Sequence, residues 1–151
     1  MSDPSSATAE ATAALNLPTP PARPSEAAMK TALQAYIDQM NAGDAEGLVA
    51  LFAPDATIED PVGSPARAGA ELGAWFRASA ALKARLRAVT ACRGSFAREA
   101  ALVFEVEYNA DGRRLRIRTL DVCQFNEDGL ITNLRGYWGP ADVDDIGPAV
   151  D

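Results

Sequence analysis

The 151-residue sequence contains no histidine and only two cysteines, Cys92 and Cys123. The absence of histidine excludes Ser-His and Cys-His catalysis and every metal site that needs a histidine ligand. Two cysteines form neither a metal cluster nor a disulfide framework, and Cys123, on an apolar strand face, is expected to be a small core residue. Lysine occurs only at positions 30 and 83. Acid–base chemistry in this chain must therefore rely on carboxylates, with tyrosine in support.

Long hydrophobic runs and excess positive charge are also missing. No apolar run approaches the ~20 residues of a membrane-spanning helix, and the N-terminus lacks the basic start and apolar block of a signal peptide. The net charge of −7 argues against nucleic acid and anionic membrane surfaces as partners. We therefore expect a cytoplasmic protein. Its 48% of hydrophobic residues are enough to bury a substantial core in one domain.

The chain divides into an extension, a folded body and a tail. Residues 1–24 are rich in Ala, Pro, Ser and Thr, a composition typical of a flexible N-terminal extension. The folded domain is expected over residues 25–139. Four acidic residues lie in the last ten positions, so residues 140–151 are expected to form an acidic C-terminal tail.

Helical periodicity dominates the first half of the domain. Ser25 is expected to cap a first helix that ends at Gly43, and Asp44 to cap a second, short helix. A third helix is predicted near residues 69–80. Between the second and third helices, "ATIED" is typical of a short strand that ends before Pro61.

Segments of strand type fill the second half: "ARLRAVTAC", "ALVFEVEYN", "RRLRIRTLDVCQF" and "LITNLRGYWG". "NADGR" and "NEDGL", between the later segments, carry the Asp-Gly signal of tight hairpins. Helices followed by an antiparallel meander indicate an α+β domain with the helices packed on one face of a curved sheet.

Three polar residues fall where apolar ones are expected. Asp121 lies in the middle of the apolar face of "IRTLDVCQF", Asp60 follows the apolar side of "ATIED", and Tyr36 lies inside the apolar stripe of the first helix. Burying an unpaired carboxylate costs several kcal/mol or more. Each residue also has a simpler structural interpretation. A buried tyrosine finds a hydrogen-bond partner, an aspartate before proline ends a strand, and Asp121 could pair with a nearby arginine.

The order of these three residues resembles a known family. "YIDQMNAGDAEGLVALFAPDATIEDPVG", followed later by "LDVCQFNEDGLITNLRGYW", is similar to the bacterial Δ5-3-ketosteroid isomerases (steroid delta-isomerases). The resemblance covers residues 30–139, and its most specific segments are "EDPVG" and "LDVCQF". It implies the cone-shaped NTF2-like (cystatin-like) fold that nuclear transport factor 2 and the SnoaL-like cyclases share. In that fold three N-terminal helices pack on a curved, mostly antiparallel sheet, through which family members form homodimers.

The resemblance also implies a role for each residue. Asp60 matches the general base that carries a proton from C4 to C6 of a 3-oxo-Δ5-steroid. Tyr36 and Asp121 match the pair that donates hydrogen bonds to the dienolate oxygen. In this family the apolar surroundings of the second acid keep it protonated, so that it can donate. Such a proton shuttle needs no cofactor.

The implied substrate is small, hydrophobic and steroid-like. The expected walls of its pocket, whose simplest interpretation is hydrophobic core, are Met40, Leu86, Phe104, Val106, Thr119, Leu134 and Trp138. Some family members support the oxyanion tyrosine with further tyrosines from the second and third helices. Here Phe52 and Phe76 stand at those positions, which affects the expected rate rather than the reaction class.

Two other interpretations remain open. One is another enzyme of the same fold, such as a SnoaL-type polyketide cyclase or an epoxide hydrolase. A hydrolase needs an arginine between two acids, and Arg116 and Arg118 fall on the face opposite Asp121. The other is a non-catalytic protein that binds hydrophobic ligands, for which two pocket acids would be liabilities. The outer sheet face is a mixed polar surface compatible with a symmetric homodimer: Val103, Glu105, Arg116, Arg118, Asn133, Arg135 and Tyr137.

Overall fold

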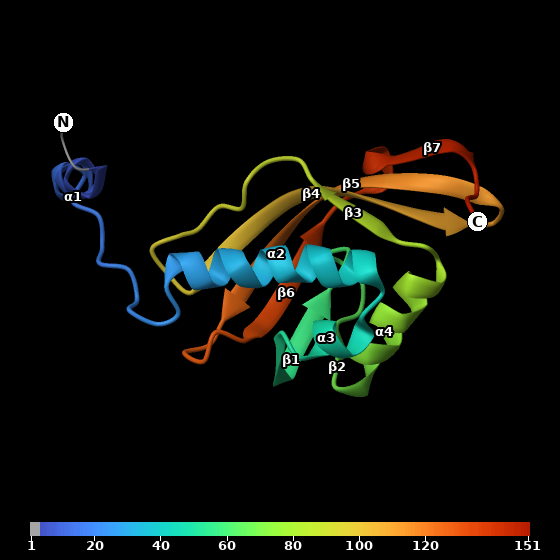
Figure 1. The fold of residues 1–151 in the computed structure, drawn as a ribbon, viewed down its shortest axis with the longest axis horizontal. Coiled ribbons are helices and arrows are strands. Elements are labelled where there is room, and N and C mark those ends of the chain that lie inside the picture. Colours follow the sequence, from blue (N-terminus) through green and yellow to red (C-terminus); the bar gives the residue numbers. More distant parts are fainter. Residues whose placement is uncertain (1–3) are drawn as a thin grey trace.

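A curved sheet with helices in front of it forms the body of the computed structural model, which describes residues 4–151 (Figure 1). Over these residues the sheet has seven strands in the order β2-β1-β6-β5-β4-β3, with β7 paired to β5. The β1–β6 pair is parallel and the other pairs are antiparallel. The strands are β1 (Phe52–Glu59), β2 (Arg67–Ala68), β3 (Arg85–Ala88), β4 (Glu99–Ala110), β5 (Arg113–Phe125), β6 (Ile131–Tyr137) and β7 (Val143–Pro148). The predicted α+β, NTF2-like fold is confirmed.

The three predicted helices are present, and the predicted caps explain where the first of them begins and ends and where the second begins. The helices are α1 (Pro4–Ala14), α2 (Glu26–Ala42), α3 (Ala45–Val49) and α4 (Ala70–Ala81), with a short 3-10 turn η1 (Pro140–Asp142). The Ser25 side chain accepts a hydrogen bond from the Ala28 N–H, and Gly43 ends α2 at a left-handed φ of 68°. Asp44 caps α3 through the N–H of Gly47. Within residues 4–151, none of these helices is long and apolar enough to cross a membrane.

The β4–β5 hairpin decides which residues face the helices. Asp111 and Gly112 both have positive φ, 50° and 77°, as a two-residue type I′ turn requires. The resulting register places Leu102 opposite Asp121. Because alternate residues of a strand face the same side, the even positions of β4 and the odd positions of β5 point toward the helices.

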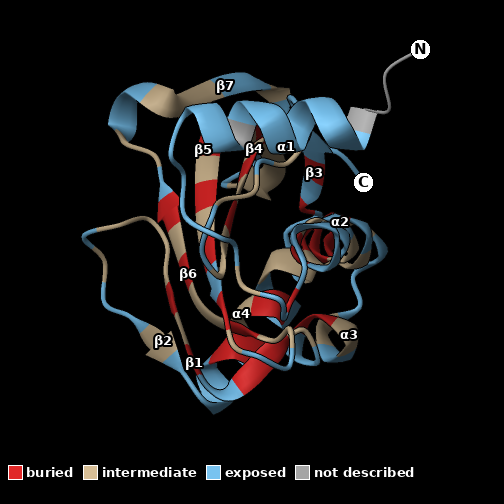
Figure 2. Ribbon diagram, turned by 90° about the vertical axis from the view of Figure 1, so that its left-hand side faces the viewer, coloured by how far each residue is buried: buried red, intermediate tan, exposed pale blue. Residues whose placement is uncertain are grey.

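The hydrophobic core lies between the helices and this inner face of the sheet, and its residues are red in Figure 2. Ile58, Leu102 and Leu134 are fully buried there. The apolar stripe of α2 completes the core from the other side: Met29, Leu33, Tyr36, Ile37 and Met40. Tyr36 thus occupies a core position, as its place in the helical pattern predicts.

The N-terminal extension contains a helix that the sequence analysis did not predict. Helix α1 lies apart from the sheet in Figure 1, and all of its described side chains are exposed. The end of the extension contacts the body: Pro24 is buried, and the Arg23 carbonyl accepts a hydrogen bond from Arg98 Nε at 2.8 Å. Flexibility of residues 1–24 stays a prediction.

The acidic tail, expected outside the folded domain, is paired with the sheet. Strand β7 runs antiparallel to the first half of β5, with Asp144 opposite Arg116. Arg113 Nη2 lies 2.9 Å from Asp145 Oδ1, and Arg118 pairs with Asp144. These arginines offset the acidic charge of a segment whose composition does not favour a strand.

Candidate active site

A cavity of about 280 Å³ lies between α2, α4 and the inner face of the sheet. Small-molecule sites measure roughly 300–1,000 Å³, so this one suits a compact ligand. Most of the predicted wall residues line it: Met40, Leu86, Phe104, Val106, Thr119 and Trp138. Leu134 does not line it, since this side chain is fully buried in the core. Tyr36 and Asp60 line the cavity, whereas Asp121 is buried behind its surface.

Asp60 follows the last residue of β1 and presents one carboxylate oxygen to the cavity without a partner. The indole N–H of Trp138 donates a hydrogen bond to Asp60 Oδ1 at 2.8 Å. Among residues 4–151 no donor reaches Oδ2. Burial raises the pKa of Asp60, while the Trp138 hydrogen bond and the Arg67 cation act in the opposite direction. Trp138 therefore orients the Asp60 carboxylate, and the Oδ2 oxygen remains free to act as a base.

Burial favours the protonated form of the Asp121 carboxyl. It is 1% exposed, and neither of its oxygens has a hydrogen-bond partner among the described residues. Burial, and then the nearby charge of Asp60, raise the pKa of Asp121 well above its ordinary value. A protonated carboxyl is a hydrogen-bond donor, so Asp121 has a proton to offer and no acceptor within the described protein.

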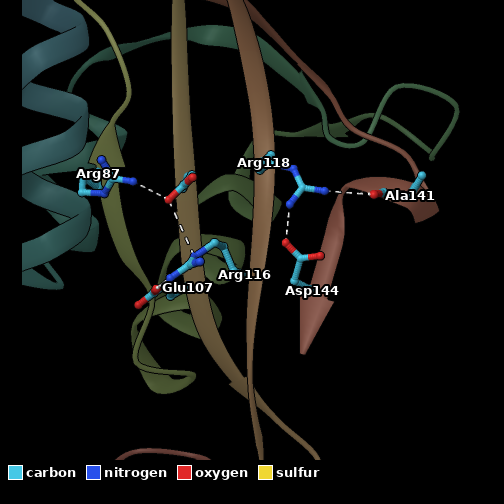
Figure 3. A network of polar contacts seen from close by, with 7 residues as sticks. Arg87, Glu107, Arg116, Arg118, Ala141 and Asp144 are labelled. Atoms are coloured by element: carbon cyan, nitrogen blue, oxygen red, sulfur yellow. Dashed lines mark hydrogen bonds and ion pairs between the residues drawn. The ribbon is translucent and has the colours of Figure 1, made fainter. Parts of the chain in front are cut away.

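The arginines that could have paired with Asp121 are engaged on the other face of the sheet. Arg116 Nη2 lies 2.9 Å from Glu107 Oε1, and Arg118 pairs with Asp144, as Figure 3 shows. The structural interpretation of Asp121 as an ion-pair partner is therefore wrong.

Tyr36 offers a second donor from α2. Its side chain is 3% exposed, yet it lines the cavity, and no described residue hydrogen-bonds its hydroxyl. Burial, followed by the negative charge of Asp121 and Asp60, raises the pKa of Tyr36 well above 10.0. The hydroxyl thus stays protonated and able to donate.

Aromatic rings rather than hydroxyl groups surround Tyr36. Its ring packs edge-on against Phe76 at 6.3 Å, and Phe76 packs against Phe52 at 5.7 Å. Phenylalanine rings, and not the supporting tyrosines of some family members, are thus grouped near Tyr36 as predicted. Phe52, however, begins β1 instead of lying on the second helix. Neither phenylalanine can support the Tyr36 hydroxyl with a hydrogen bond.

Gly136 brings the two acids together. It lies opposite Asp121 in the β5–β6 register. A Cβ atom at this position would lie 2.5 Å from Asp60 Oδ1 and 3.1 Å from Asp121 Oδ1. Both carboxyl groups therefore occupy the space above a residue that has no side chain.

Arg67 is a cavity residue that the sequence analysis missed. Its guanidinium lies over the Trp75 ring, 5.1 Å from the centroid, and Nη1 donates to the Asp60 main-chain carbonyl at 3.3 Å. The segment "PVGSPARAG" predicted only a loop, because the strand β2 that carries Arg67 is two residues long. No periodic pattern can reveal so short an element.

The far end of the cavity is formed by residues from β4 and the end of α4. Tyr108 lines it together with Ser79 and Leu82. Tyr108 follows Phe104 and Val106 on the same side of β4, so strand alternation already indicated its direction. The cavity is therefore mostly apolar, with Asp60 and Tyr36 in its lining and a further hydroxyl group on Tyr108.

The arrangement can move a proton and stabilise a negatively charged oxygen. A carboxylate with a free oxygen serves as the base, the Tyr36 hydroxyl offers a donor at the cavity wall, and the Asp121 carboxyl lies buried behind that wall. Donors in a dry, preorganised cavity stabilise developing charge more than water does.

Comparisons with known proteins identify relatives of this chain. Residues 33–134 match the family model of the SnoaL-like domain. The steroid Delta-isomerase of Nocardioides simplex is 37% identical over 120 residues, which cover 78% of this chain and 94% of that protein. The epoxide hydrolase LasB of Streptomyces lasalocidi is 35% identical over 135 residues, covering 79% of this chain but only 44% of LasB.

A solved structure shares the fold. It is that of SalBIII, an epoxide hydrolase/cyclase-like enzyme with a role in pyran ring formation in the polyether salinomycin. The TM-score is 0.71 at 25% identity, and the match covers 78% of this chain and 95% of SalBIII. The relatives are thus enzymes, with more than one reaction among them.

Proposed function

This chain belongs to the family of SnoaL-like domains, and we propose that it is a cofactor-independent isomerase that moves a C=C bond from Δ5 to Δ4 in a 3-oxo-steroid or a similar enone. The observation that carries the proposal is the buried, unpartnered Asp121 carboxyl, which lies beside the Asp60 base. The likeness to a steroid Delta-isomerase supports the same reaction.

In the first step Asp60 Oδ2 takes a proton from C4. The electron pair of that C–H bond forms the C3=C4 bond, and the carbonyl π pair moves onto the oxygen at C3. Tyr36 and Asp121 donate hydrogen bonds to this oxygen, where the negative charge develops. Because the interaction strengthens as the charge grows, it lowers the barrier rather than only binding the substrate.

In the second step the dienolate collapses toward the conjugated product. The C3=O bond forms again, C4=C5 becomes the double bond, and the former C5=C6 pair takes the proton from Asp60 at C6. The base returns to its starting state, so no cofactor is consumed. The phenylalanines beside Tyr36 leave its hydroxyl less polarised than a hydrogen-bonded one, so the proposed rate is modest for this reaction.

One assay tests the proposal directly. Purified full-length protein is mixed with 5-androstene-3,17-dione, and the ultraviolet absorbance of the conjugated enone is followed. We expect absorbance to rise with enzyme concentration and to stay at the background rate with Asp60→Asn. Background rates for the unaltered protein would refute the isomerase assignment.

A second candidate is an epoxide hydrolase or cyclase. The Arg67 cation beside Asp60 favours it, as does the likeness to LasB and SalBIII. In this structure, however, Arg67 donates to a main-chain carbonyl and makes no ion pair with Asp60 or Asp121 in the described chain. Conversion of an epoxide to a diol or cyclic ether, without enone isomerisation, would select this alternative.

A non-catalytic ligand-binding protein is the third candidate. An unsatisfied buried polar group costs about 1–3 kcal/mol, and Asp121 carries two such oxygens. A binding protein for hydrophobic ligands gains nothing from that cost, whereas an enzyme that stabilises an oxyanion does.

A further inference from the structure

Arg67 is a charged cavity residue that the proposed reaction does not yet use. We infer that it is a positioning residue for the Asp60 base: it holds the main chain at Asp60 and places positive charge beside the carboxylate while leaving Oδ2 unpaired for the substrate. The inference rests on the proposed role of Asp60 and extends it to a residue on another strand.

The position of Arg67 is fixed from three directions. Strand β2 pairs with β1 so that Arg67 lies opposite Ile58. The guanidinium lies over the Trp75 ring at 5.1 Å, a cation–π contact that orients the planar group. Nη1 donates to the Asp60 main-chain carbonyl at 3.3 Å. The charge is thus held at the residue whose carboxylate it must influence.

The contact differs from those of the surface arginines. Arg113, Arg116 and Arg118 each bind a carboxylate directly. Arg67 makes no such ion pair among the described residues, because its hydrogen bond goes to the Asp60 backbone. A direct ion pair would occupy Oδ2, and the base would have to break it before accepting a proton. Because Arg67 binds the backbone instead, it supplies positive charge near Asp60 while Oδ2 stays free.

Among the described groups around Asp60, Arg67 is the cation whose charge opposes the effect of burial on the pKa of Asp60. Among residues 4–151, the titratable or charged groups that face Asp60 are Tyr36 from α2, Asp121 from β5 and Arg67 from β2. Burial favours the neutral forms of Tyr36 and Asp121, and neither group supplies a positive charge that would favour an ionised base. Trp138 orients Oδ1 but is itself uncharged.

The test measures the ionisation of Asp60 in the full-length protein. Carboxyl-carbon NMR titrations are compared for the unaltered chain, Arg67→Gln, Arg67→Lys and the control Arg77→Gln. Arg77 is exposed on α4 and lines no part of this cavity. Because a nearby cation favours the charged carboxylate, we expect Arg67→Gln to shift the Asp60 titration to higher pH. Arg67→Lys, which keeps the charge, should shift it less, and Arg77→Gln should not shift it.

The pH profile of turnover gives a second readout. Asp60 acts as a base only when ionised, so Arg67→Gln should lose activity on the acid side and recover it at higher pH. An unshifted Asp60 titration in Arg67→Gln, or an equal shift in Arg67→Lys or in the control, would overturn the inference. A uniform loss at every pH with an unchanged titration would show a purely structural role. The titration needs no substrate, so a failed isomerase assay leaves this test intact.

Discussion

Asp60 and Asp121 meet above Gly136, with an oxygen of each carboxyl within 3.1 Å of the place where a Cβ atom would stand. Two acids this close do not ionise equally, because each charge disfavours the other. Their surroundings divide the roles. Asp121 is buried without a partner among the described residues, which favours its protonated form, whereas Asp60 has the Trp138 hydrogen bond and the Arg67 cation in favour of the charged form.

Adding a methyl group at the meeting point should misplace the base. In Gly136→Ala the new Cβ would lie 2.5 Å from Asp60 Oδ1, too close to be tolerated without movement of that carboxylate. A displacement of about 1 Å can cost roughly 10²-fold in rate, and we expect a loss of that order in enone formation. The control is Gly73→Ala, where the Cβ meets the flexible end of Arg77 at 3.2 Å and Val49 Cγ2 at an ordinary contact distance of 3.6 Å. Unchanged turnover in Gly136→Ala would show that the base does not depend on this space.

Removing the base should stop the reaction without unfolding the protein. In Asp60→Asn the carboxamide keeps the shape but cannot take a proton from C4. We expect turnover to fall by about 10²–10⁴-fold, the usual contribution of a general base. Asp55→Asn, at an exposed position of β1, is the matched control. Near-normal turnover in Asp60→Asn, measured as enone absorbance, would remove Asp60 from the mechanism.

Two substitutions separate the donor role of Asp121 from a structural one. Asp121→Asn keeps a donor of similar volume and should lose little activity or stability. Asp121→Leu has no donor, and we expect turnover to fall by about 10²–10³-fold. Its stability should not fall, because the unpartnered carboxyl is gone. If the residue served an ion pair instead, both variants would lose roughly 3–5 kcal/mol in urea unfolding.

The raised pKa of Asp121 predicts how stability depends on pH. Its folded-state pKa lies above the ordinary value of 3.8, so between these two values the folded protein binds the proton that the unfolded chain releases. The free energy of unfolding must then fall as pH rises through that window. Asp121→Leu lacks this contribution, so its stability relative to the unaltered protein should increase with pH. Urea unfolding from below pH 3.8 to neutral pH measures the difference, and parallel curves for the two proteins would contradict it.

We also predict a homodimer formed through the outer face of the sheet. Val103, Leu120 and Tyr137 are register neighbours across β4, β5 and β6 and make an apolar centre, with Tyr137 42% exposed. Ion pairs flank this centre on both sides, among them Arg87 with Glu105 and Arg135 with Glu59. Val103→Glu would bury a charge at the contact and should give a monomer, whereas Ala78→Glu, at an exposed position of α4, should not. Light scattering at micromolar concentration decides, and a monomeric unaltered protein would contradict the prediction.

Local signals predicted helices α2 and α3 and the β4–β5 hairpin well, since their causes lie within a few residues. The side chains of Ser25 and Asp44 cap the helices that follow them, and Asp111-Gly112 forms the expected turn. Strand β7 escaped prediction because its stabilising arginines lie on β5, some thirty positions earlier.

The sequence predicted which side of the sheet each site residue faces, but not which of these residues line the cavity. Strand alternation correctly directs Thr119, Leu134 and Trp138 inward, yet it cannot say how far the cavity extends along each strand. Leu134 therefore belongs to the hydrophobic core, whereas Thr119 lines the cavity. The hydrogen bond from Trp138 to Asp60 and the position of Arg67 depend on the parallel β1–β6 pair and the short β2, which no sequence pattern reveals.

Strand β7 has a consequence for the solubility of the chain. Without it, the first half of β5 would be an open edge on that side, with unpaired N–H and C=O groups able to recruit a strand from another molecule. The acidic segment closes this edge and surrounds it with negative charge, a combination that discourages intermolecular strand addition. The ion pairs of Arg113 and Arg118 with Asp145 and Asp144 are partly exposed and weakened by salt. Protection against aggregation at this edge should therefore decline as ionic strength rises.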